Sequence, residues 1–443
     1  MFAATVIIPC RNKLETLREV LRGLQGQSFP LDAFEVLVVD DGSTDGTRAH
    51  VEGLAGSLPQ VALESVPPHA DVCPALVRNR GLARARGEIV IFLDADVLVG
   101  PELVAEHVAT QRKVPGGTAL IGYVYAYPLL ASERTPEKIK APPVGEVLAR
   151  LPALLREDPR HWKDGRETHY RIWPDMATCP MPWLFFWGGN SSLPLSLARE
   201  LGGFDEAFKN WGFEDVELGY RLWKRRVPFT LRREAWGFHY PHPTGSDDRR
   251  FENMYQFLRK HPEPYPELNT FASTRFQQPG AARVRWEVLD RLAAPPPAPP
   301  EPPRELAAAL LRLARERGRG PVAWFGEWPT GETEAEPEHV SRPFHPDAAD
   351  GRAALAGFAL PQADGTFSSA VALDYWVSLS DASRRFLCAE LTRVAGTCLF
   401  ASTTADAPLA AGPEYAVEVL AVPGAQVQLV SRAAEPLQGA ALP

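Results

Sequence analysis

The chain has 443 residues, of which 45% are hydrophobic and 23% charged, and these values predict a globular protein with more than one domain. The formal net charge of −8 argues against a nucleic-acid partner, because domains that bind nucleic-acid phosphates are normally basic. The 43 prolines are an excess that indicates linkers or long loops.

The amino-terminal sequence MFAATVIIPCRNK has no basic leader, and its apolar run is too short for a signal peptide. No segment approaches the roughly 18 apolar residues of a membrane span, so we expect a cytoplasmic protein. The five cysteines are scattered and never spaced Cys-x-x-Cys. They therefore predict reduced, structural thiols and neither a disulfide framework nor a zinc site.

The first hundred residues alternate between strand and helix patterns. Strands are predicted at 5–9, 34–41 and 89–96, and helices at 14–24, after the GSTDGT segment at 42–47, and around 77–88. The three strands are apolar and end in polar residues, as buried parallel strands do. Ligands of open parallel sheets bind beyond the carboxyl ends of the strands, so the pattern predicts an α/β domain with its site there.

The later part of the chain is less regular. Residues 123–182 are rich in prolines and aromatic residues and predict irregular loops that form the wall of a substrate cleft. Helices are then predicted at 195–201 and 214–226, and a strand at 228–240.

A proline-rich stretch, AAPPPAPPEPP at 293–303, marks the clearest domain boundary. Consecutive prolines favour an extended segment that cannot join a packed sheet. The sequence therefore predicts a first domain at 1–292, a linker at 293–303 and a smaller α/β domain at 304–443.

Asp94 and Asp96 end the third predicted strand. In an extended chain alternate side chains point the same way, so both carboxylates face one side while Ala95 packs elsewhere. Two hard oxygen ligands suit a divalent cation bound to a diphosphate. Solvated turn residues are the other interpretation, and the place after a buried strand favours the metal.

Other polar residues have a functional and a structural interpretation. Asp40 and Asp41 end the second predicted strand, where either could accept hydrogen bonds from a pyrimidine base or a ribose, or form a structural turn. Arg78 lies in a basic cluster that could meet phosphate or be a solvated helix face. His239 and His242 are surface residues or candidate imidazole ligands of a carboxylate-held metal, which would favour manganese over magnesium.

Glu214 and Asp215 begin the predicted helix at 214–226. Acidic residues in a first helical turn face unpaired backbone N–H groups and the positive end of the helix dipole, which is a sufficient structural reason for both. A catalytic role is the alternative, and the remaining motifs decide between them.

Six segments follow one another along the first domain: IIPCRN (7–12), VVDDGSTDGT (38–47), VRNRGLARARGEIVIFLDAD (77–96), GGNSSLP (188–194), GGFDEAF (202–208) and WGFEDVELGYRL (211–222). In this order they resemble the family 2 glycosyltransferases, which have the GT-A fold, over roughly residues 3–262. The later block, with its following FH, is similar to bacterial chondroitin polymerase and to the carboxyl-terminal block of galactosyltransferases. The resemblance implies a Rossmann-like, mostly parallel sheet.

The resemblance also implies a metal-dependent, inverting transfer of a sugar from a nucleotide sugar, namely a UDP-sugar, to a hydroxyl acceptor. Asp40 or Asp41 would contact uracil, and the backbone near Pro9 would help to form the base pocket. Arg78 would lie near the ribose or the diphosphate, and Asp94 would contact the ribose and the metal.

The remaining roles follow from the same resemblance. Asp96 would bind Mn²⁺ or Mg²⁺, and His239 would complete its coordination. Asp215 would be the general base, with Glu214 holding an acceptor or donor hydroxyl. The cleft for the donor sugar and the acceptor would be lined by Gly188, Gly189, Asn190 and Trp211.

Three positions depart from the family pattern. Cys10 stands where an aromatic residue is frequent, Lys13 where glutamate is common, and Phe213 where glycine is frequent. The first two affect the expected base pocket. Related retaining enzymes replace the Glu-Asp pair, so Glu214 and Asp215 favour inversion.

The carboxyl-terminal domain has a weaker pattern. Residues 366–403 resemble the later half of a class I methyltransferase, with a strand, a helix and a strand. VAWFGEWPTGE at 322–332 lacks the G-x-G-x-G that would bring the backbone close to the cofactor. We therefore expect a degenerate, methyltransferase-like α/β domain used for acceptor binding or association.

Two other functions remain open: a non-catalytic protein that binds sugar nucleotides as a scaffold, and a bifunctional glycosyl- and methyltransferase. The acceptor could be a glycan, a lipid-linked molecule, a peptide or a small molecule. The loops at about 123–190 that would select it carry no pattern that identifies it.

Overall fold

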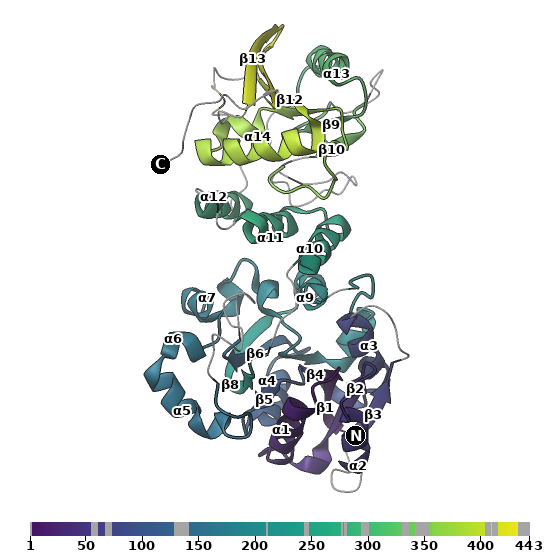
Figure 1. Ribbon diagram of the computed structural model, residues 1–443. Helices are drawn as coiled ribbons and strands as arrows, with labels where there is room; N and C mark the ends of the chain where they lie inside the picture. Colours follow the sequence, from purple (N-terminus) through teal and green to yellow (C-terminus); the bar gives the residue numbers. More distant parts are fainter. Residues whose placement is uncertain are drawn as a thin grey trace. The chain divides into compact units, whose positions relative to one another are not determined.

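The computed structural model describes residues 2–54, 61–66, 73–127, 141–209, 211–242, 248–275, 278, 281–293, 301–329, 336–341, 343, 355, 357–403, 409 and 415–432. The chain divides into two compact units, Met1–Asn253 and Met254–Pro443 (Figure 1). This division differs from the predicted domains, because helices α11 (Pro264–Arg275) and α12 (Ala281–Ala293) belong to the second unit. Residues 294–300 of the predicted linker lie outside the described part.

The first unit is built on an eight-stranded sheet with the order β3-β2-β1-β4-β7-β6-β8-β5. Its strands are β1 (Phe2–Cys10), β2 (Phe34–Asp40), β3 (Val61–Ser65), β4 (Gly87–Leu93), β5 (Val97–Val99), β6 (Ala119–Tyr125), β7 (Asn190–Pro194) and β8 (Phe229–His239). The strands β3, β2, β1 and β4 run parallel, whereas β7 is antiparallel to β4 and β6. The α/β prediction and the strands predicted at 5–9, 34–41, 89–96 and 228–240 are confirmed.

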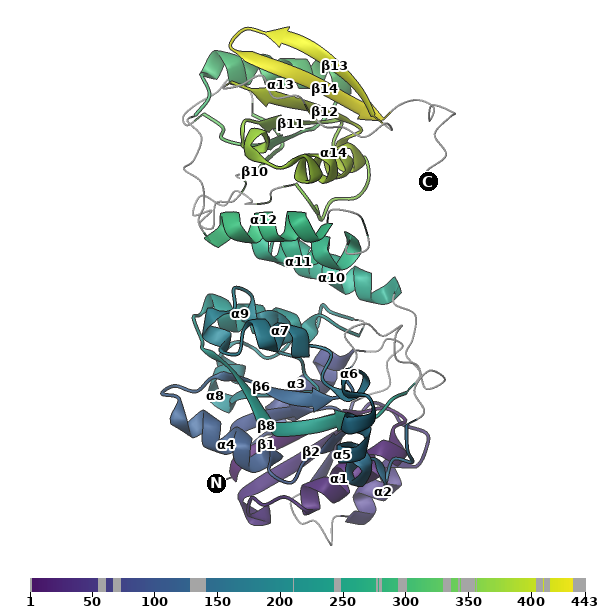
Figure 2. The ribbon, with the colours of Figure 1, turned by 90° about the vertical axis from the view of Figure 1, so that its left-hand side faces the viewer.

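Helices pack on both faces of this sheet (Figure 2). They are α1 (Leu14–Gln25), α2 (Thr47–Leu54), α3 (Pro74–Arg84), α4 (Leu103–Lys113) and α8 (Leu195–Glu200), with a short 3₁₀ helix η1 (Leu31–Ala33). Helix α9 (Glu214–Lys224) packs against α3. Because successive strand residues point to opposite faces, Val6 and Ile8 join the core formed with α1 and α4, while Ile7 meets α3. The approach at Ile7 is so close that a Cβ on Gly81 would lie 2.5 Å from its Cγ2.

The region predicted to be irregular contains helices, so that prediction is wrong in part. The described residues of 123–182 include α5 (Val147–Glu157), α6 (Pro159–Trp162), α7 (Glu167–Ile172) and the 3₁₀ helix η3 (Met176–Thr178), and η4 (Pro182–Phe185) follows. Val147, Leu151 and Leu154 are buried at helical spacing. Pro152 lies inside α5 and obscures that pattern, because proline normally breaks a helix interior.

The second unit has a six-stranded sheet with the order β10-β9-β11-β12-β14-β13. The strands are β9 (Val322–Phe325), β10 (His339–Ser341), β11 (Ser369–Leu373), β12 (Thr397–Ser402), β13 (Tyr415–Val422) and β14 (Ala425–Arg432). The first four in the sheet are parallel, and β14 and β13 are antiparallel. The predicted strand, helix and strand of 366–403 are confirmed as β11, α14 and β12.

Helices α13 (Arg304–Gly318) and α14 (Asp381–Ala395) cover this sheet, with the 3₁₀ helix η5 (Tyr375–Ser378) before α14 (Figure 2). Leu306, Leu310 and Leu311 of α13 pack on Trp324 and Trp328. Helix α10 (Asp248–Lys260) spans the division between the units. Within the described residues, no helix has the length and apolar character that a membrane crossing requires.

Candidate active site

The carboxyl ends of β1, β2 and β4 bring the first group of predicted residues to one edge of the sheet. Pro9 pairs with Val39, and the half-buried ring lies one residue before the end of β1. Asp40 ends β2, is 3% exposed, and accepts a hydrogen bond from the Ser43 amide at 3.1 Å. Asp41 follows it and forms an ion pair with Arg11 at 3.4 Å.

The loops that follow β1 and β2 are joined by hydrogen bonds. The amide of Asn12 donates to Ser43 Oγ at 2.9 Å, and the amide of Thr44 donates to Asn12 Oδ1 at 2.7 Å. The amide of Leu14, the first residue of α1, donates to Asp45 Oδ2 at 2.9 Å. This long-range cap satisfies a backbone donor that the helix itself cannot pair, so the loops form a rigid edge.

Arg78, on α3, connects two of the predicted carboxylates. Its Nη1 donates to Glu214 Oε1 at 2.8 Å, and its Nη2 donates to Asp94 Oδ1 at 2.9 Å. The arginine is 4% exposed, so these are buried ion pairs. Among the described residues, Nε of Arg78 and Oε2 of Glu214 are buried without a hydrogen-bond partner. Orphaned buried groups of this kind are unusual and mark a place with unused binding capacity.

Two glycines allow the backbone to approach this ion-pair cluster. A Cβ on Gly188 would lie 2.7 Å from the Arg78 guanidinium carbon, and one on Gly189 would lie 3.0 Å from Asp94 Oδ2. The amide of Asp94 donates to the Gly189 carbonyl at 3.2 Å. Burial raises the pKa of the Asp94 carboxyl above its ordinary value, although Arg78 opposes the shift.

Asn190 points away from this edge. It is 2% exposed, its Nδ2 donates to the carbonyl of Ala235 at 2.8 Å, and its Oδ1 lies 2.9 Å from His107 Nε2. The side chain thus holds strands together inside the sheet. Burial lowers the pKa of His107 to about 4, so this imidazole is neutral at physiological pH.

Glu214 and Asp215 begin α9, as predicted, and have unequal surroundings. Glu214 is 2% exposed, and burial together with the charge of Asp215 raises its pKa to about 7. Asp215 is half-buried, and its Oδ2 accepts a hydrogen bond from the Gly188 amide at 2.7 Å. Phe213 precedes them with φ of 72°, a left-handed conformation that favours glycine and explains why glycine suits this position.

A second cluster surrounds Asp96. Its Oδ2 lies 3.1 Å from His242 Nε2 and 3.0 Å from Lys13 Nζ, and its Oδ1 lies 3.9 Å from His239 Nε2. Burial opposes ionisation of Asp96, but the hydrogen bond to His242 and the charges of His239 and Lys13 outweigh it, and the pKa of this carboxyl lies well below its ordinary range.

Asp96, His239 and His242 can each offer one ligand atom, and these atoms lie within 4.8 Å of one another. One carboxylate oxygen and two imidazole nitrogens fit a divalent transition metal and suit manganese better than magnesium. Asp94 was predicted to share the metal, and in this structure its Oδ1 is paired with Arg78.

Tyr127 lies between the two clusters. Its ring centroid is 5.0 Å from that of His239, and a Cβ on Gly189 would lie 2.9 Å from its hydroxyl oxygen. The ring of Trp187 is tilted against that of Tyr127, with 5.1 Å between the ring centroids and 42° between the ring planes. The two rings form an apolar surface beside the charged groups.

The predicted residues therefore fall into three neighbourhoods and two outliers. Asp40 and Asp41 lie at the end of β2, and the ion-pair cluster consists of Arg78, Asp94, Glu214 and Asp215. Asp96 and His239 belong, with His242, to the candidate metal cluster. Asn190 is directed into the sheet, and Trp211 is 55% exposed. His242, for which the sequence leaves a structural and a metal-binding interpretation open, joins His239 beside Asp96, and so does Lys13, which departs from the family pattern.

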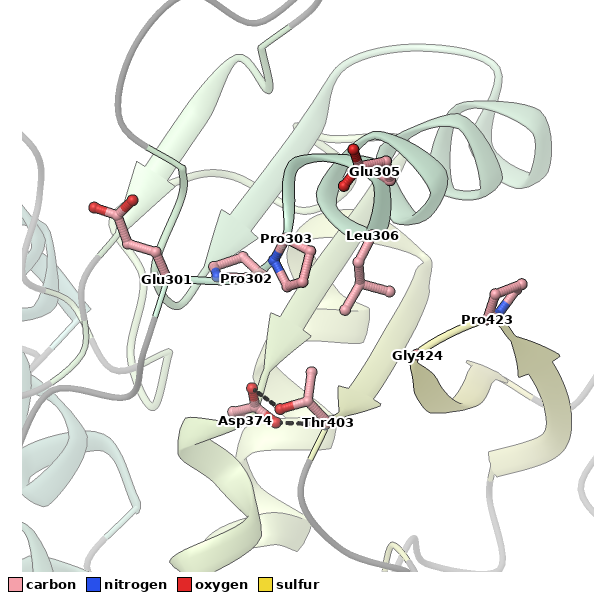
Figure 3. A pocket seen from close by; sticks show the side chains of 9 residues that line it. All are labelled: Glu301, Pro302, Pro303, Glu305, Leu306, Asp374, Thr403, Pro423 and Gly424. Atoms are coloured by element: carbon pink, nitrogen blue, oxygen red, sulfur yellow. Dashed lines mark hydrogen bonds between the residues drawn. The ribbon is translucent and has the colours of Figure 1, made fainter.

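The second unit has a cavity of about 290 Å³ at the carboxyl ends of β11 and β12. Asp374 and Thr403 form its floor, where both oxygens of Asp374 accept hydrogen bonds from Thr403, at 2.7 and 2.8 Å (Figure 3). Leu306 and three prolines contribute to the wall. After β9 the described chain reads Gly326, Glu327, Trp328 and Pro329, which is not a glycine-rich loop.

The first unit is thus an α/β domain with carboxylates, an arginine and imidazoles at the carboxyl edge of its sheet, as expected for a GT-A glycosyltransferase. Comparison with protein families supports this class. Residues 5–141 match the family described as Glycosyl transferase family 2, and residues 168–242 match the one described as N-terminal domain of galactosyltransferase.

The chain is similar to named proteins. Validoxylamine A glucosyltransferase of Streptomyces hygroscopicus subsp. jinggangensis is 34% identical over 295 residues, which are 64% of this chain and 67% of that protein. Uncharacterized glycosyltransferase YfnE of Bacillus subtilis is 31% identical over 278 residues, 57% of this chain and 69% of that protein. Chondroitin synthase of Escherichia coli is 27% identical over 242 residues, 54% of this chain and 35% of that protein.

The protein belongs to glycosyltransferase family 2, and its first unit carries the glycosyltransferase domain. The predicted resemblance is thereby confirmed. Among solved structures, TarS of Staphylococcus aureus has 18% identity and a TM-score of 0.43, covering 67% of this chain and 50% of that one, a likeness too distant to carry an argument about function.

Proposed function

We propose that the protein is a metal-dependent, inverting glycosyltransferase that moves a sugar from a UDP-sugar to a hydroxyl acceptor, with Asp215 as general base. The observation that carries this proposal is the contrast within the pair that begins α9. Glu214 is buried against Arg78, whereas Asp215 is half-buried on the same rigid helix beside Gly188. Of these two carboxylates, Asp215 is the one that is both partly exposed and held in a fixed position.

Asp215 retains the capacity to accept a proton. Its Oδ2 accepts one hydrogen bond from Gly188 and its Oδ1 one from Val216 at 2.8 Å. An ionised carboxylate has about four acceptor positions, so sites remain for an acceptor hydroxyl. In an inverting transfer the base takes the proton of that hydroxyl as its oxygen attacks the anomeric carbon.

Asp96, His239 and His242 would hold the divalent cation. When bound, such an ion offsets the negative charge of a departing diphosphate. Arg78 would orient Asp94 toward the donor, because its guanidinium already fixes that carboxylate at 2.9 Å.

Asp40 and Asp41 would bind the uracil base beside Pro9. The support is their position at the end of β2 and their near-complete burial, at 3% and 7% exposure, which holds both carboxylates in place. The relatives add to the acceptor question. One is named a glucosyltransferase of validoxylamine A and another a chondroitin synthase, so small molecules and glycans are the first acceptors to test.

The second unit, we infer, supports acceptor binding or association and is not a methyltransferase. The absence of a glycine-rich loop in the described residues after β9 favours this choice. Calorimetry with S-adenosylmethionine checks it: micromolar binding would support the bifunctional alternative.

Nucleotide release from a panel of UDP-, GDP- and dTDP-sugars, with Mn²⁺ or Mg²⁺, tests the proposal. We expect slow release from one UDP-sugar, abolished by a chelator and accelerated by the acceptor. Release from a GDP- or dTDP-sugar alone would overturn the assignment of uracil as the nucleotide base of the donor. Binding of UDP without release, under every condition and with every acceptor, would favour the non-catalytic scaffold.

A further inference from the structure

Lys13 lies at a position where a cation is unfavourable for the helix. It precedes α1 as the capping residue, and its carbonyl accepts the hydrogen bond from the Leu17 amide at 2.8 Å. The amino end of a helix carries partial positive charge, so acidic or small polar residues are normal there and lysine is not. The cap itself comes from Asp45, which leaves Lys13 free of that role.

The lysine side chain turns to the metal cluster. Its Nζ lies 3.0 Å from Asp96 Oδ2, the oxygen that also lies 3.1 Å from His242 Nε2. Asp96 is 11% exposed at its side chain and Lys13 is 29% exposed. The ammonium therefore reaches from the accessible edge of the site to an atom that a bound cation would use.

A lysine ammonium and a divalent cation cannot both occupy this carboxylate oxygen without strong repulsion. The backbone of Lys13 is nevertheless held in place, because the amides of its neighbours Asn12 and Leu14 donate hydrogen bonds to the loop after β2. Once displaced from Asp96, its ammonium stays within one side-chain length of the site. The amino end of α1 adds further positive potential there.

We propose that Lys13 is an exchangeable cation of the donor site. Without an added ion its ammonium pairs with Asp96, and when a divalent cation and a nucleoside diphosphate bind it moves to the diphosphate. This inference rests on the proposed function, because it requires that the site take a metal and a diphosphate.

The exchange has a thermodynamic consequence that distinguishes it from a passive salt bridge. Lys13 competes with the metal for Asp96 in the empty enzyme, and it attracts the diphosphate once the metal is present. Removing its charge must therefore strengthen the binding of the metal alone and weaken the binding of UDP in the presence of metal. A residue with a purely structural role would weaken both or neither.

The test uses the full-length chain and two probes, Mn²⁺ alone followed by the EPR signal of the free ion, and UDP at saturating Mn²⁺ followed by calorimetry. For Lys13→Met we expect Mn²⁺ to bind at least about 5-fold more tightly and UDP at least about 5-fold more weakly than in the parent, the lower bound of a typical coupling between sites. Lys13→Arg keeps the charge and should stay close to the parent in both. Lys113→Met, at the exposed end of α4, controls for the loss of one positive charge.

The outcomes are separable. The exchange is overturned if Mn²⁺ and UDP bind to the parent, and Lys13→Met either changes neither affinity or changes both in the same direction. That result leaves the proposed function standing. A parent that binds neither probe overturns the proposed function, and the exchange with it. Thermal melts report folding, and Lys13→Gln repeats the comparison if the methionine variant does not fold.

Discussion

The two sheets of this protein present different chemistry at the carboxyl ends of their parallel strands. In the first unit these ends hold a buried arginine between two carboxylates and a group of one aspartate and two histidines. In the second unit the corresponding edge holds Asp374, whose carboxylate is satisfied by Thr403 of the neighbouring strand end. Within the described residues, the candidate metal group belongs only to the first unit.

The difference shows that the order of the strands places loops where a binding site can form, but does not provide the side chains that such a site needs. Both sheets place loops at a carboxyl edge, where ligands of α/β folds bind. At this edge the first unit leaves two atoms of ionisable groups, Arg78 Nε and Glu214 Oε2, buried without a hydrogen-bond partner, whereas after β9 in the second unit the buried atom without a partner among the described residues is the indole Nε1 of Trp328. In the second, Asp374 adopts a φ of 59° and makes two hydrogen bonds to Thr403, which binds the loop ends to each other. Function depends on which polar atoms the packing leaves available.

The strongest test of the comparison is Asp215→Asn. Because the amide cannot accept the hydroxyl proton, we expect kcat for sugar transfer to fall by about 10²-fold or more while UDP affinity stays unchanged. Steady-state transfer assays and calorimetry measure the two quantities. Asp32→Asn, an exposed residue of η1, is the matched control. Full transfer by Asp215→Asn would exclude this residue as the base.

His242→Ala tests whether the metal cluster needs both histidines. Losing one ligand of three should reduce Mn²⁺ affinity by more than about 10-fold, since even outer-shell partners of metal ligands contribute about that much. The EPR signal of free Mn²⁺ measures the affinity. His50→Ala, on α2 outside the cluster, should bind Mn²⁺ as the parent does. Equal affinities in both variants would assign the site to Asp96 and His239 without His242.

Glu214→Gln tests how much the burial of an ionised Glu214 beside Asp215 destabilises the first unit. Burial and Asp215 raise the pKa of Glu214 from 4.5 to about 7, so the native state holds a proton that the unfolded chain loses across this range. Stability should therefore fall as pH rises from 4.5 to 7, and the glutamine variant should show a shallower fall. Thermal midpoints at several pH values check it. Glu52→Gln, an exposed site on α2, should keep the parent slope.

The smallest effect is expected in the second unit. Asp374→Ala removes two hydrogen bonds at a half-buried site and should lower stability by about 1 kcal/mol, with no change in nucleotide release. Denaturant unfolding and the release assay give the two values. Loss of release would show that this edge also contributes to the reaction and would break the contrast between the units.

Part of the candidate site was predictable because short motifs encode local geometry. Acidic residues at a helix start placed Glu214 and Asp215 at the beginning of α9. Strand alternation did not bring Asp94 and Asp96 to one side, because β4 ends at Leu93 and the two aspartates lie in the turn that follows, where Asp94 pairs with Arg78 and Asp96 lies beside the histidines. Asn190 was predicted to line the cleft with Gly189, and its side chain is directed to His107 inside the sheet. The cleft-lining role of Asn190 was inferred from the GGNSSLP motif at 188–194. The direction of its side chain depends on contacts with β6, β8 and α4, which are distant in sequence.

The α/β class, the family resemblance and the two acidic motifs could be predicted from the amino-acid sequence, because strand periodicity, helix capping and motif order are local properties of the chain. Three contacts of the site come from the folding of distant segments onto one another: Arg78 pairs with both Asp94 and Glu214, His242 lies beside His239, and Lys13 pairs with Asp96. The contacts join residues that are 16 positions apart for Arg78 and Asp94 (94 − 78) and up to 146 positions apart for Asp96 and His242 (242 − 96). Their partners are chosen by the packing of the sheet and its helices, which no local pattern records.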